Sequence, residues 1–371
     1  MLTSPFMLDG IEKGARIAVA MSGGVDSSVA AALMVEAGYD VVGITLQLYD
    51  HGAMIQKKGA CCAGQDIYDA RQVAERLGFP HYILDYETLF RQNVIDDFAD
   101  SYLRGETPIP CIRCNQKVKF RDLLSTAQDL GAKALVTGHY VKRVVNGKAE
   151  LHQAIDKTRD QSYFLFTTTQ DQLDYLRFPL GSFASKAETR EHAQRFSLNV
   201  AEKPDSQDIC FVPNGNYAAI VSKLRPGALD PGEIMHIDGR VLGKHEGIIN
   251  FTVGQRKGIG ISSAEPLYVI RLDASSKRVY VGPKEALAKN DIHLKEVNWL
   301  IDIRQFKEEY ACQIKIRSSA TPINATVKAT SPTEAHVTFS LPEYGIAAGQ
   351  AGVFYDGDRV LGGGWIFNKE D

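Results

Sequence analysis

Apolar runs alternate with helix-like segments over the first 200 residues of the chain. Short apolar runs predict strands at residues 15–21, 40–48, 81–84 and 134–137. Segments of helical periodicity between them predict helices at residues 26–37, 66–77, 87–104 and 117–130. Strands separated by helices are typical of a parallel sheet covered by helices. The pattern therefore predicts an α/β domain in this part of the chain.

The pattern changes after about residue 214. Turn pairs such as Pro226-Gly227 and Asp238-Gly239 interrupt short segments, and helical periodicity is scarce. Short strand-like runs follow at residues 267–272, 278–281, 312–317, 324–330, 335–341, 352–355 and 360–367. We therefore predict three domains: a catalytic α/β domain at 1–213, a small central domain at 214–285 and an all-β barrel at 286–371.

Composition narrows the class of protein. A chain of 371 residues with 44% hydrophobic and 23% charged residues is ordinary globular protein of two or three domains. The net charge of -3 excludes a basic nucleic-acid coat, so nucleic acid would have to bind at local patches. No apolar run approaches the roughly 20 residues of a membrane span, and the first 14 residues lack the apolar core of an export signal. We expect a cytoplasmic protein without membrane contact.

The segment SGGVDSS, residues 22–28, lies between a predicted strand and a predicted helix. Backbone N–H groups at a helix N-terminus bind anions, and glycines let them approach phosphate oxygens closely. We therefore predict a phosphate or pyrophosphate site here, with Asp26 placing a Mg²⁺ ion on the pyrophosphate. The alternative is a tight turn with a capping aspartate.

The six cysteines are expected to have individual roles, because a chain without an export signal is a poor candidate for a disulfide framework. Cys111 and Cys114 precede a predicted helix in CIRCNQKVKFR, which has four basic residues and no acid. This setting lowers a thiol pKa and makes a thiolate in this stretch a candidate nucleophile, beside four positive charges that could bind RNA phosphates. The alternative is half of a zinc site, although no second ligand pair follows. Cys61-Cys62 is interpreted as a solvent-facing or partner-facing loop.

A third cysteine, Cys210, stands in DSQDICFVP, where a buried apolar role is the default interpretation. However, the combination of SGGVDSS, CNQKVKF at 114–120 and SQDICF at 206–211 resembles the tRNA-specific 2-thiouridylase family of PP-loop ATP pyrophosphatases. The segments 138–140, 157–165 and 251–258 match as well, and the resemblance extends over about residues 16–365.

The resemblance implies an ATP-dependent sulfurtransferase that converts the wobble uridine of tRNA to 2-thiouridine. ATP, with Mg²⁺, would adenylate the C2 oxygen and release pyrophosphate. A persulfide on Cys210 would deliver sulfur to C2 as AMP leaves, and Cys114 would form a disulfide with Cys210 or free hydrogen sulfide. The implied partners are tRNA and a persulfide-carrying donor protein.

The resemblance also assigns binding residues. The expected nucleotide-binding positions are Ala20, Met21, Ser22, Gly23, Gly24, Val25, Asp26, Ser27, Leu46 and Gly138. The expected tRNA-binding positions are Ile109, Pro110, Cys111, His139, Arg159, Asp160, Gln161, Arg317, Ser318 and Gln350. Cys111 departs from the family, because many members carry an aspartate there as a candidate acid or base, although a thiol can also transfer protons. No metal-ligand set is predicted.

Three alternatives stay open at this point. The ATP chemistry could serve an amidotransferase that uses ammonia. Cys111, Cys114 and Cys210 could instead hold an iron–sulfur cluster with one open iron, so that sulfur transfer is cluster-based. The chain could also be a tRNA-binding protein without enzymatic activity. Iron content, and the effect of replacing Asp26 or the loop serines on ATP turnover, distinguish these possibilities.

Overall fold

The computed structural model describes residues 6–48, 62–205, 209–212 and 215–369. It divides into two compact units: Met1–Asn93, Ile112–Gln207 and Asp358–Val360 form the first, and Val94–Cys111, Asp208–Gly357 and Leu361–Asp371 form the second. The predicted boundary at 213/214 and the loop position Cys61 lie outside the described residues, whereas Cys62 is the first residue of a helix.

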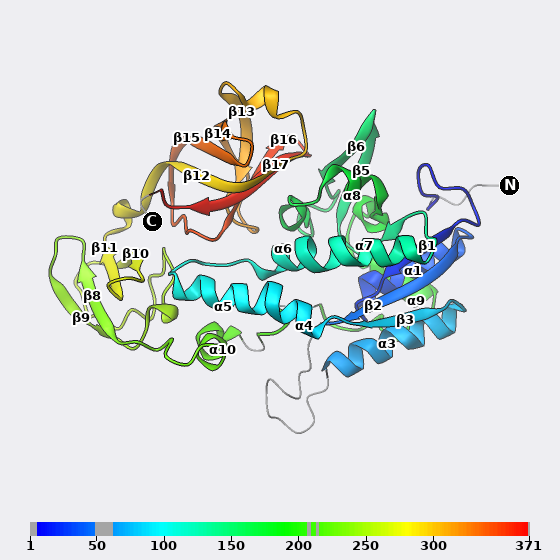
Figure 1. Ribbon diagram of the computed structural model, residues 1–371, viewed down its shortest axis with the longest axis horizontal. Helices are drawn as coiled ribbons and strands as arrows, with labels where there is room; N and C mark the ends of the chain where they lie inside the picture. Colours follow the sequence, from blue (N-terminus) through cyan, green and yellow to red (C-terminus); the bar gives the residue numbers. More distant parts are fainter. Residues whose placement is uncertain (1–5, 49–61, 206–208, 213–214, 370–371) are drawn as a thin grey trace. The chain divides into compact units, whose positions relative to one another are not determined.

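A five-stranded parallel sheet forms the centre of the first unit (Figure 1). Its order is β3-β2-β1-β4-β7, with every neighbouring pair parallel. The strands are β1 (Arg16–Ala20), β2 (Asp40–Gln47), β3 (His81–Asp85), β4 (Leu135–Val136) and β7 (Leu176–Arg177). The predicted parallel sheet is confirmed. Because β1 lies between β2 and β4, the carboxyl ends of β1 and β4 meet where strand order reverses, which is where open α/β sheets bind ligands.

Helices pack around this sheet. They include α1 (Val25–Glu36), α3 (Cys62–Leu77), α7 (Phe120–Asp129), α8 (Gln170–Tyr175) and α9 (Lys186–Arg195). Helix α1 contacts β1, β2, α3 and α9, and its residues 29–34 are almost completely buried. Three consecutive alanines within that run allow neighbouring elements to approach the helix from several sides.

Two predicted helices differ from the structure. The helix expected at 87–104 is divided into α4 (Glu87–Phe90), a π-helical turn (Arg91–Ile95) and α5 (Asp96–Leu103). The helix expected from residue 117 begins earlier, with α6 (Pro110–Cys114) and a second π-helical turn (Asn115–Lys119) before α7. Proline is favoured at the first helical position, which explains the earlier start at Pro110. The predicted placement of both cysteines before the helix is therefore wrong.

A hairpin of β5 (Val141–Asn146) and β6 (Lys148–Gln153) has no counterpart among the predicted strands. Its strands are joined at Asn146-Gly147, a residue pair that strongly favours hairpin turns and could have revealed it. The far end of β6 pairs with the chain near Arg359, where His152 lies opposite that residue.

The second unit contains α10 (Tyr217–Leu224) and two β structures. The first is a four-stranded sheet of order β10-β11-β8-β9, made of β8 (Gly232–His236), β9 (Val241–His245), β10 (Tyr268–Asp273) and β11 (Arg278–Gly282). The second is an antiparallel barrel of β12 (Ala288–Trp299), β13 (Tyr310–Lys315), β14 (Ile323–Ser331), β15 (Glu334–Tyr344), β16 (Ala351–Asp356) and β17 (Arg359–Phe367). Pairing between β12 and β17 closes it, which confirms the predicted all-β barrel.

Strand β12 was not predicted, although it is a long strand of the barrel. Its inward residues Ile292 and Leu294 alternate as expected, but Glu296 has a φ of 50° and the pairing with β17 shifts register between Lys295 and Asn298. This irregularity disrupts the alternation by which strands are found in a sequence. Within the described residues, no helix combines the length and apolar character needed to cross a membrane.

The barrel core predicts a measurable stability effect. Phe354 is fully buried, and its ring lies 5.7 Å from that of Trp299. Phe354→Ala should destabilise the barrel by about 3–5 kcal/mol, because it leaves a cavity in a closed core. Both tryptophans of the chain belong to barrel strands, so denaturant unfolding followed by tryptophan fluorescence reports on this part. Leu341→Ala, at a position that is 75% exposed, should change stability by less than about 0.5 kcal/mol.

Candidate nucleotide and thiol sites

The SGGVDSS loop connects β1 to α1, with Gly24 as the N-cap of the helix. Gly23 has a φ of 72°, and a Cβ atom there would overlap the carbonyl oxygen of Asp66, so the loop requires glycine at this position. The hydroxyls of Ser27 and Ser28 donate to the Gly24 carbonyl at 3.2 and 2.8 Å. These contacts fix a loop whose backbone N–H groups begin a twelve-residue helix, an arrangement that favours a bound anion.

Other expected nucleotide-binding positions come to the same edge of the sheet. Gly138 follows β4, and a Cβ atom on it would lie 2.7 Å from the backbone nitrogen of Ser27. Leu46 lies near the carboxyl end of β2, which pairs with β1. The residues from Ala20 to Ser27, together with these two, therefore meet at the carboxyl ends of β1, β2 and β4.

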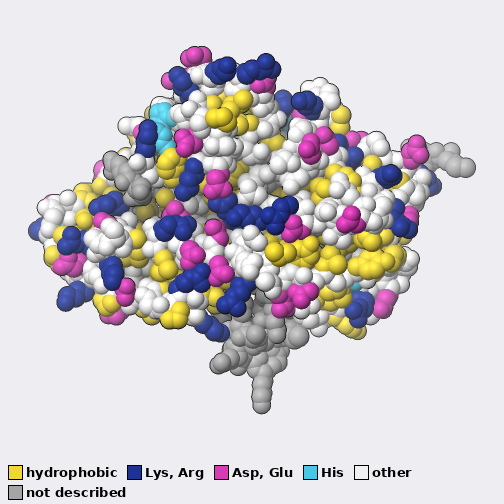
Figure 2. Space-filling view, in the orientation of Figure 1, with side chains coloured by type: hydrophobic (Ala, Val, Ile, Leu, Met, Phe, Trp, Pro, Cys, Tyr) yellow, Lys and Arg dark blue, Asp and Glu magenta, His cyan; other side chains and the backbone are white. Residues whose placement is uncertain are grey.

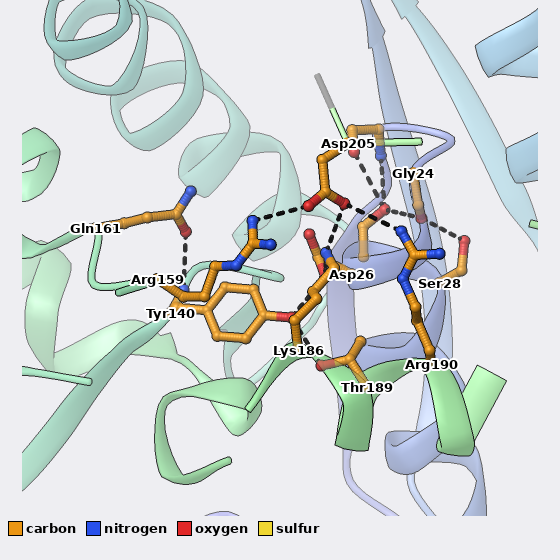
Figure 3. A network of polar contacts seen from close by, with 12 residues as sticks. Gly24, Asp26, Ser28, Tyr140, Arg159, Gln161, Lys186, Thr189, Arg190 and Asp205 are labelled. Atoms are coloured by element: carbon orange, nitrogen blue, oxygen red, sulfur yellow. Dashed lines mark hydrogen bonds and ion pairs between the residues drawn. The ribbon is translucent and has the colours of Figure 1, made fainter. Parts of the chain in front are cut away.

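The Asp26 carboxylate lies in a polar network with residues that are not among the expected binding positions (Figure 3). One carboxylate oxygen, Oδ1, accepts from Lys186 Nζ at 2.5 Å and from the Tyr140 hydroxyl at 2.7 Å. Thr189 lies 2.7 Å from the same hydroxyl. Burial and the negative charge of Asp26 raise the pKa of Tyr140, so the phenol stays protonated and holds the carboxylate as a donor.

Lys186 connects this carboxylate to a second one. Only 9% of the residue is exposed, and its Nζ lies 3.0 Å from Asp205, which also accepts from Arg159 at 2.8 Å. Burial opposes ionisation of Asp205, but its contacts with Lys186 and Arg159 outweigh burial and lower its pKa. The network thus extends from the loop to Arg159, one of the expected tRNA-binding residues (Figure 3).

A second lysine holds the outer side of the loop. Lys203 Nζ donates to the carbonyl oxygen of Gly23 at 2.9 Å and to Asp66 and Asp69 at 2.7 and 2.5 Å. Burial works against the charge on Lys203, yet the two carboxylates raise its pKa overall. Lys203 therefore fastens the loop to α3 and remains a cation. Neither lysine belongs to a local motif that would have indicated these contacts.

The structure separates the three candidate thiols by exposure. Cys111 and Cys114 are the second and last residues of α6; Cys111 is exposed and Cys114 is 7% exposed. Cys210 is exposed. Because α6 begins at Pro110, the positive end of the helix acts most strongly on Cys111. Arg121 pairs with Asp122 at 2.7 Å, which reduces the positive charge expected around these thiols.

The expected tRNA-binding residues fall into both units. His139, Arg159, Asp160 and Gln161 belong to the first unit, and Ile109, Pro110, Cys111, Arg317, Ser318 and Gln350 belong to the second. The Asp160 carboxylate accepts a hydrogen bond from the backbone nitrogen of Ala154 at 3.0 Å and so stabilises the loop between these two residues. Gln350 donates to the Thr107 carbonyl at 2.8 Å and so lies near Ile109. Arg317 is exposed and contacts the Tyr344 carbonyl at 2.9 Å.

The comparisons with known proteins now give the class of protein. Residues 15–214 match the tRNA methyl transferase HUP domain, residues 222–283 the tRNA methyl transferase PRC-barrel domain, and residues 289–366 the aminomethyltransferase beta-barrel domain. The chain is therefore a HUP-domain protein with a central PRC-barrel domain and a C-terminal β-barrel domain.

Curated relatives give the family. A protein of Paracoccus denitrificans named tRNA-specific 2-thiouridylase MnmA is 61% identical over 95% of this chain and 92% of its own length. A protein of the same name from Ruegeria pomeroyi is 62% identical over 95% of each chain. The chain belongs to the tRNA-specific 2-thiouridylase family.

Similarity to solved structures is much lower. NMN synthetase from Francisella tularensis is 18% identical, with a TM-score of 0.36 over 57% of this chain and 77% of that one. A similarity of this size bears on neither substrate nor mechanism.

His139 provides a test of the electrostatics beside the loop. Burial, reinforced by the charge of Lys119, lowers the pKa of His139 to about 3. Side-chain NMR should therefore show one imidazole that stays neutral between pH 5 and 8, and His139→Gln should remove its signal. An unfolded histidine binds a proton below about pH 6.5, so acidification from there should cost up to about 1.4 kcal/mol of stability per pH unit. Urea unfolding of the variant should depend less steeply on pH; equal slopes would contradict the lowered pKa.

Proposed function

We propose that this protein is an ATP-dependent tRNA 2-thiouridylase, which adenylates the C2 oxygen of the wobble uridine and replaces it with persulfide sulfur. The observation that carries this proposal is the identity of about 61% with proteins of that name over nearly the whole chain. In this proposal the predicted domain 1–213 performs the chemistry, and the domains 214–285 and 286–371 help to hold tRNA.

The SGGVDSS loop would bind the phosphates of ATP through its backbone N–H groups and serine hydroxyls. Lys186 and Tyr140 both use Oδ1 of Asp26, which leaves Oδ2 in position to serve as a Mg²⁺ ligand. When bound, Mg²⁺ would neutralise charge on the departing pyrophosphate. The contact with Lys186 would hold the Asp26 carboxylate in one orientation for this task, because the buried ammonium of Lys186 needs a paired anion.

The sulfur chemistry would use two thiols. The terminal sulfur of a Cys210 persulfide attacks C2 of the adenylated uridine, and AMP leaves with the former C2 oxygen. Cys114 then attacks Cys210 Sγ, which breaks the sulfur–sulfur bond, releases 2-thiouridine and leaves a Cys114–Cys210 disulfide. In the alternative order, Cys114 attacks the persulfide first and frees hydrogen sulfide, which then attacks C2. Either order leaves an oxidised pair that a dithiol must reduce.

The positions of the thiols suit different parts of this scheme. The exposed Cys210 is accessible to a persulfide donor protein, whereas the buried Cys114 is protected from unrelated oxidants. The family resemblance implies an aspartate at position 111, and Cys111, exposed near the start of α6, would take the place of that acid or base. Arg159 and Arg317 are exposed cations that would contact tRNA phosphates.

Replacement of the two cysteines tests the sulfur chemistry. In single-turnover thiolation of unmodified tRNA with ATP, Mg²⁺ and a persulfide donor, Cys114→Ser and Cys210→Ser should each reduce 2-thiouridine by at least about 10³-fold, because each removes a reacting atom. Both variants should still adenylate the tRNA. Cys312→Ser is the matched control: this strand residue is half-buried, burial raises its pKa to about 12, and its replacement should leave the rate unchanged.

The same preparations should be assayed for iron. Activity that follows bound iron, together with an equal loss in Cys111→Ser, would replace the persulfide scheme with an iron–sulfur cluster. ATP-dependent amination of the substrate in place of thiolation would indicate an amidotransferase. tRNA binding without ATP turnover in the wild type would leave a binding protein only.

Lys186→Met tests the network around the loop. It removes the cation that Asp26 and Asp205 share. A hydrogen bond to a charged group contributes about 1.5–3 kcal/mol to stability. We expect the KM for ATP to rise, or kcat/KM to fall, by about 10–100-fold in an assay of pyrophosphate release. Arg195→Met removes a surface ion pair with Glu36 from the same helix, and should leave both constants within about twofold. Equal effects of the two substitutions would exclude a specific role for Lys186.

A further inference from the structure

A group of metal-ligating side chains lies on the C-terminal barrel, and none of these residues takes part in the chemistry proposed above. Asp291 and His293 come from β12, and His336 comes from β15. One potential ligand atom from each residue lies within 4.8 Å of the others. In Figure 2, histidine side chains reach the surface over the β12 and β15 part of the barrel.

The sheet itself brings these side chains together. His293 and His336 are directly opposite one another in the antiparallel pairing of β12 with β15, and their rings stack with centroids 4.7 Å apart. Asp291 precedes His293 by two residues, so it is on the same face of β12. Its Oδ2 lies 2.8 Å from His336 Nε2. Because barrel strands hold their Cβ atoms in place, little backbone ordering would be needed to form a site here.

The donor set indicates the kind of ligand. Two imidazoles and one carboxylate suit Zn²⁺ and the neighbouring divalent transition metals, and suit Mg²⁺ or Ca²⁺ poorly. Ligands around tetrahedral zinc lie about 3.3 Å apart, since zinc–nitrogen bonds are about 2.0 Å. The present separations of up to 4.8 Å are therefore close to those required, and both histidines are only partly buried, so small side-chain rotations can close the gap.

The charged side chains around these three residues are compatible with a bound cation. Glu334 lies on β15 and adds a second carboxylate charge near His293, whereas Lys369 is a nearby positive charge. Lys328 is opposite His336 on β14, but its ammonium lies 4.0 Å from Glu308. Phe367 faces the other side of His293, with ring centroids 6.1 Å apart, and limits how far that imidazole can rotate.

We propose that Asp291, His293 and His336 form a binding site for a divalent transition metal such as Zn²⁺, with solvent completing the coordination. The metal would link β12 to β15, and one open position makes the site accessible to an additional ligand. A metal that binds the folded barrel and not the unfolded chain also stabilises the barrel.

The probe is Zn²⁺ itself, titrated into the full-length, metal-stripped protein in competition with a chelator. One site should lose at least about tenfold in affinity in His293→Ala and His336→Ala, and Asp291→Asn should weaken it less. His236→Ala is the matched control, because His236 makes a similar imidazole–carboxylate contact at 2.8 Å with Asp238 but is opposite Val281 on β11 instead of a second histidine. Affinity equal to that of the wild type in the double variant His293→Ala/His336→Ala would overturn the proposal.

A second measurement covers the case in which a variant folds poorly and separates this site from the cysteines. One equivalent of Cu²⁺ bound to the wild-type protein, with thiols alkylated, should give an electron paramagnetic resonance spectrum with nitrogen coupling from two imidazoles. Zn²⁺ should also raise the unfolding midpoint of the barrel followed by tryptophan fluorescence. A spectrum without coupling from two nitrogen ligands would mean adventitious surface binding only. The same conclusion would follow if the variants at positions 291, 293 and 336 bound the metal as tightly as the control His236→Ala. Neither result depends on thiolation activity.

Discussion

The nearly buried ammonium group of Lys186 lies within contact distance of two carboxylates, and the candidate site depends on this arrangement. A buried charge is costly unless a partner compensates it, so the ammonium of Lys186 needs the carboxylates of Asp26 and Asp205, and its contact helps to lower the pKa of Asp205. Removal of Lys186 would take away the cation that both carboxylates share. The contacts thereby connect the first residues of α1, where phosphate is expected, to Asp205 through Lys186.

Close packing of the backbone adds a second constraint on the loop. Gly23 meets Asp66 and Gly138 meets the start of α1 so closely that neither position accommodates a side chain. Lys203 then joins Gly23 to Asp66 and Asp69, which turns a short glycine-rich turn into a rigid part of the sheet edge. Rigidity of this kind favours anion binding, because the N–H groups already point in fixed directions before the ligand arrives.

The two cysteines of α6 show how a local helix boundary changes a chemical interpretation. Pro110 starts the helix before Cys111, and a π-helical turn follows Cys114. Cys114 is consequently buried within a continuous helical segment, and Cys111 takes the exposed place near the positive helix end. Extra residues in π-helical turns shift the faces of a helix, and such turns are frequent at functional sites.

The sequence alone determined the parallel sheet, the barrel and the loop motif, because each depends on local periodicity or on contiguous residues. It did not reveal Lys186, whose contact with Asp26 joins residues 160 positions apart, nor the pairing of Asp291 with His336 across 45 positions. It also missed β12, since the irregularity at Glu296 breaks the alternation of that strand. Tertiary structure decided these features, because only the folded chain brings distant side chains into the same low-dielectric or cross-strand environment.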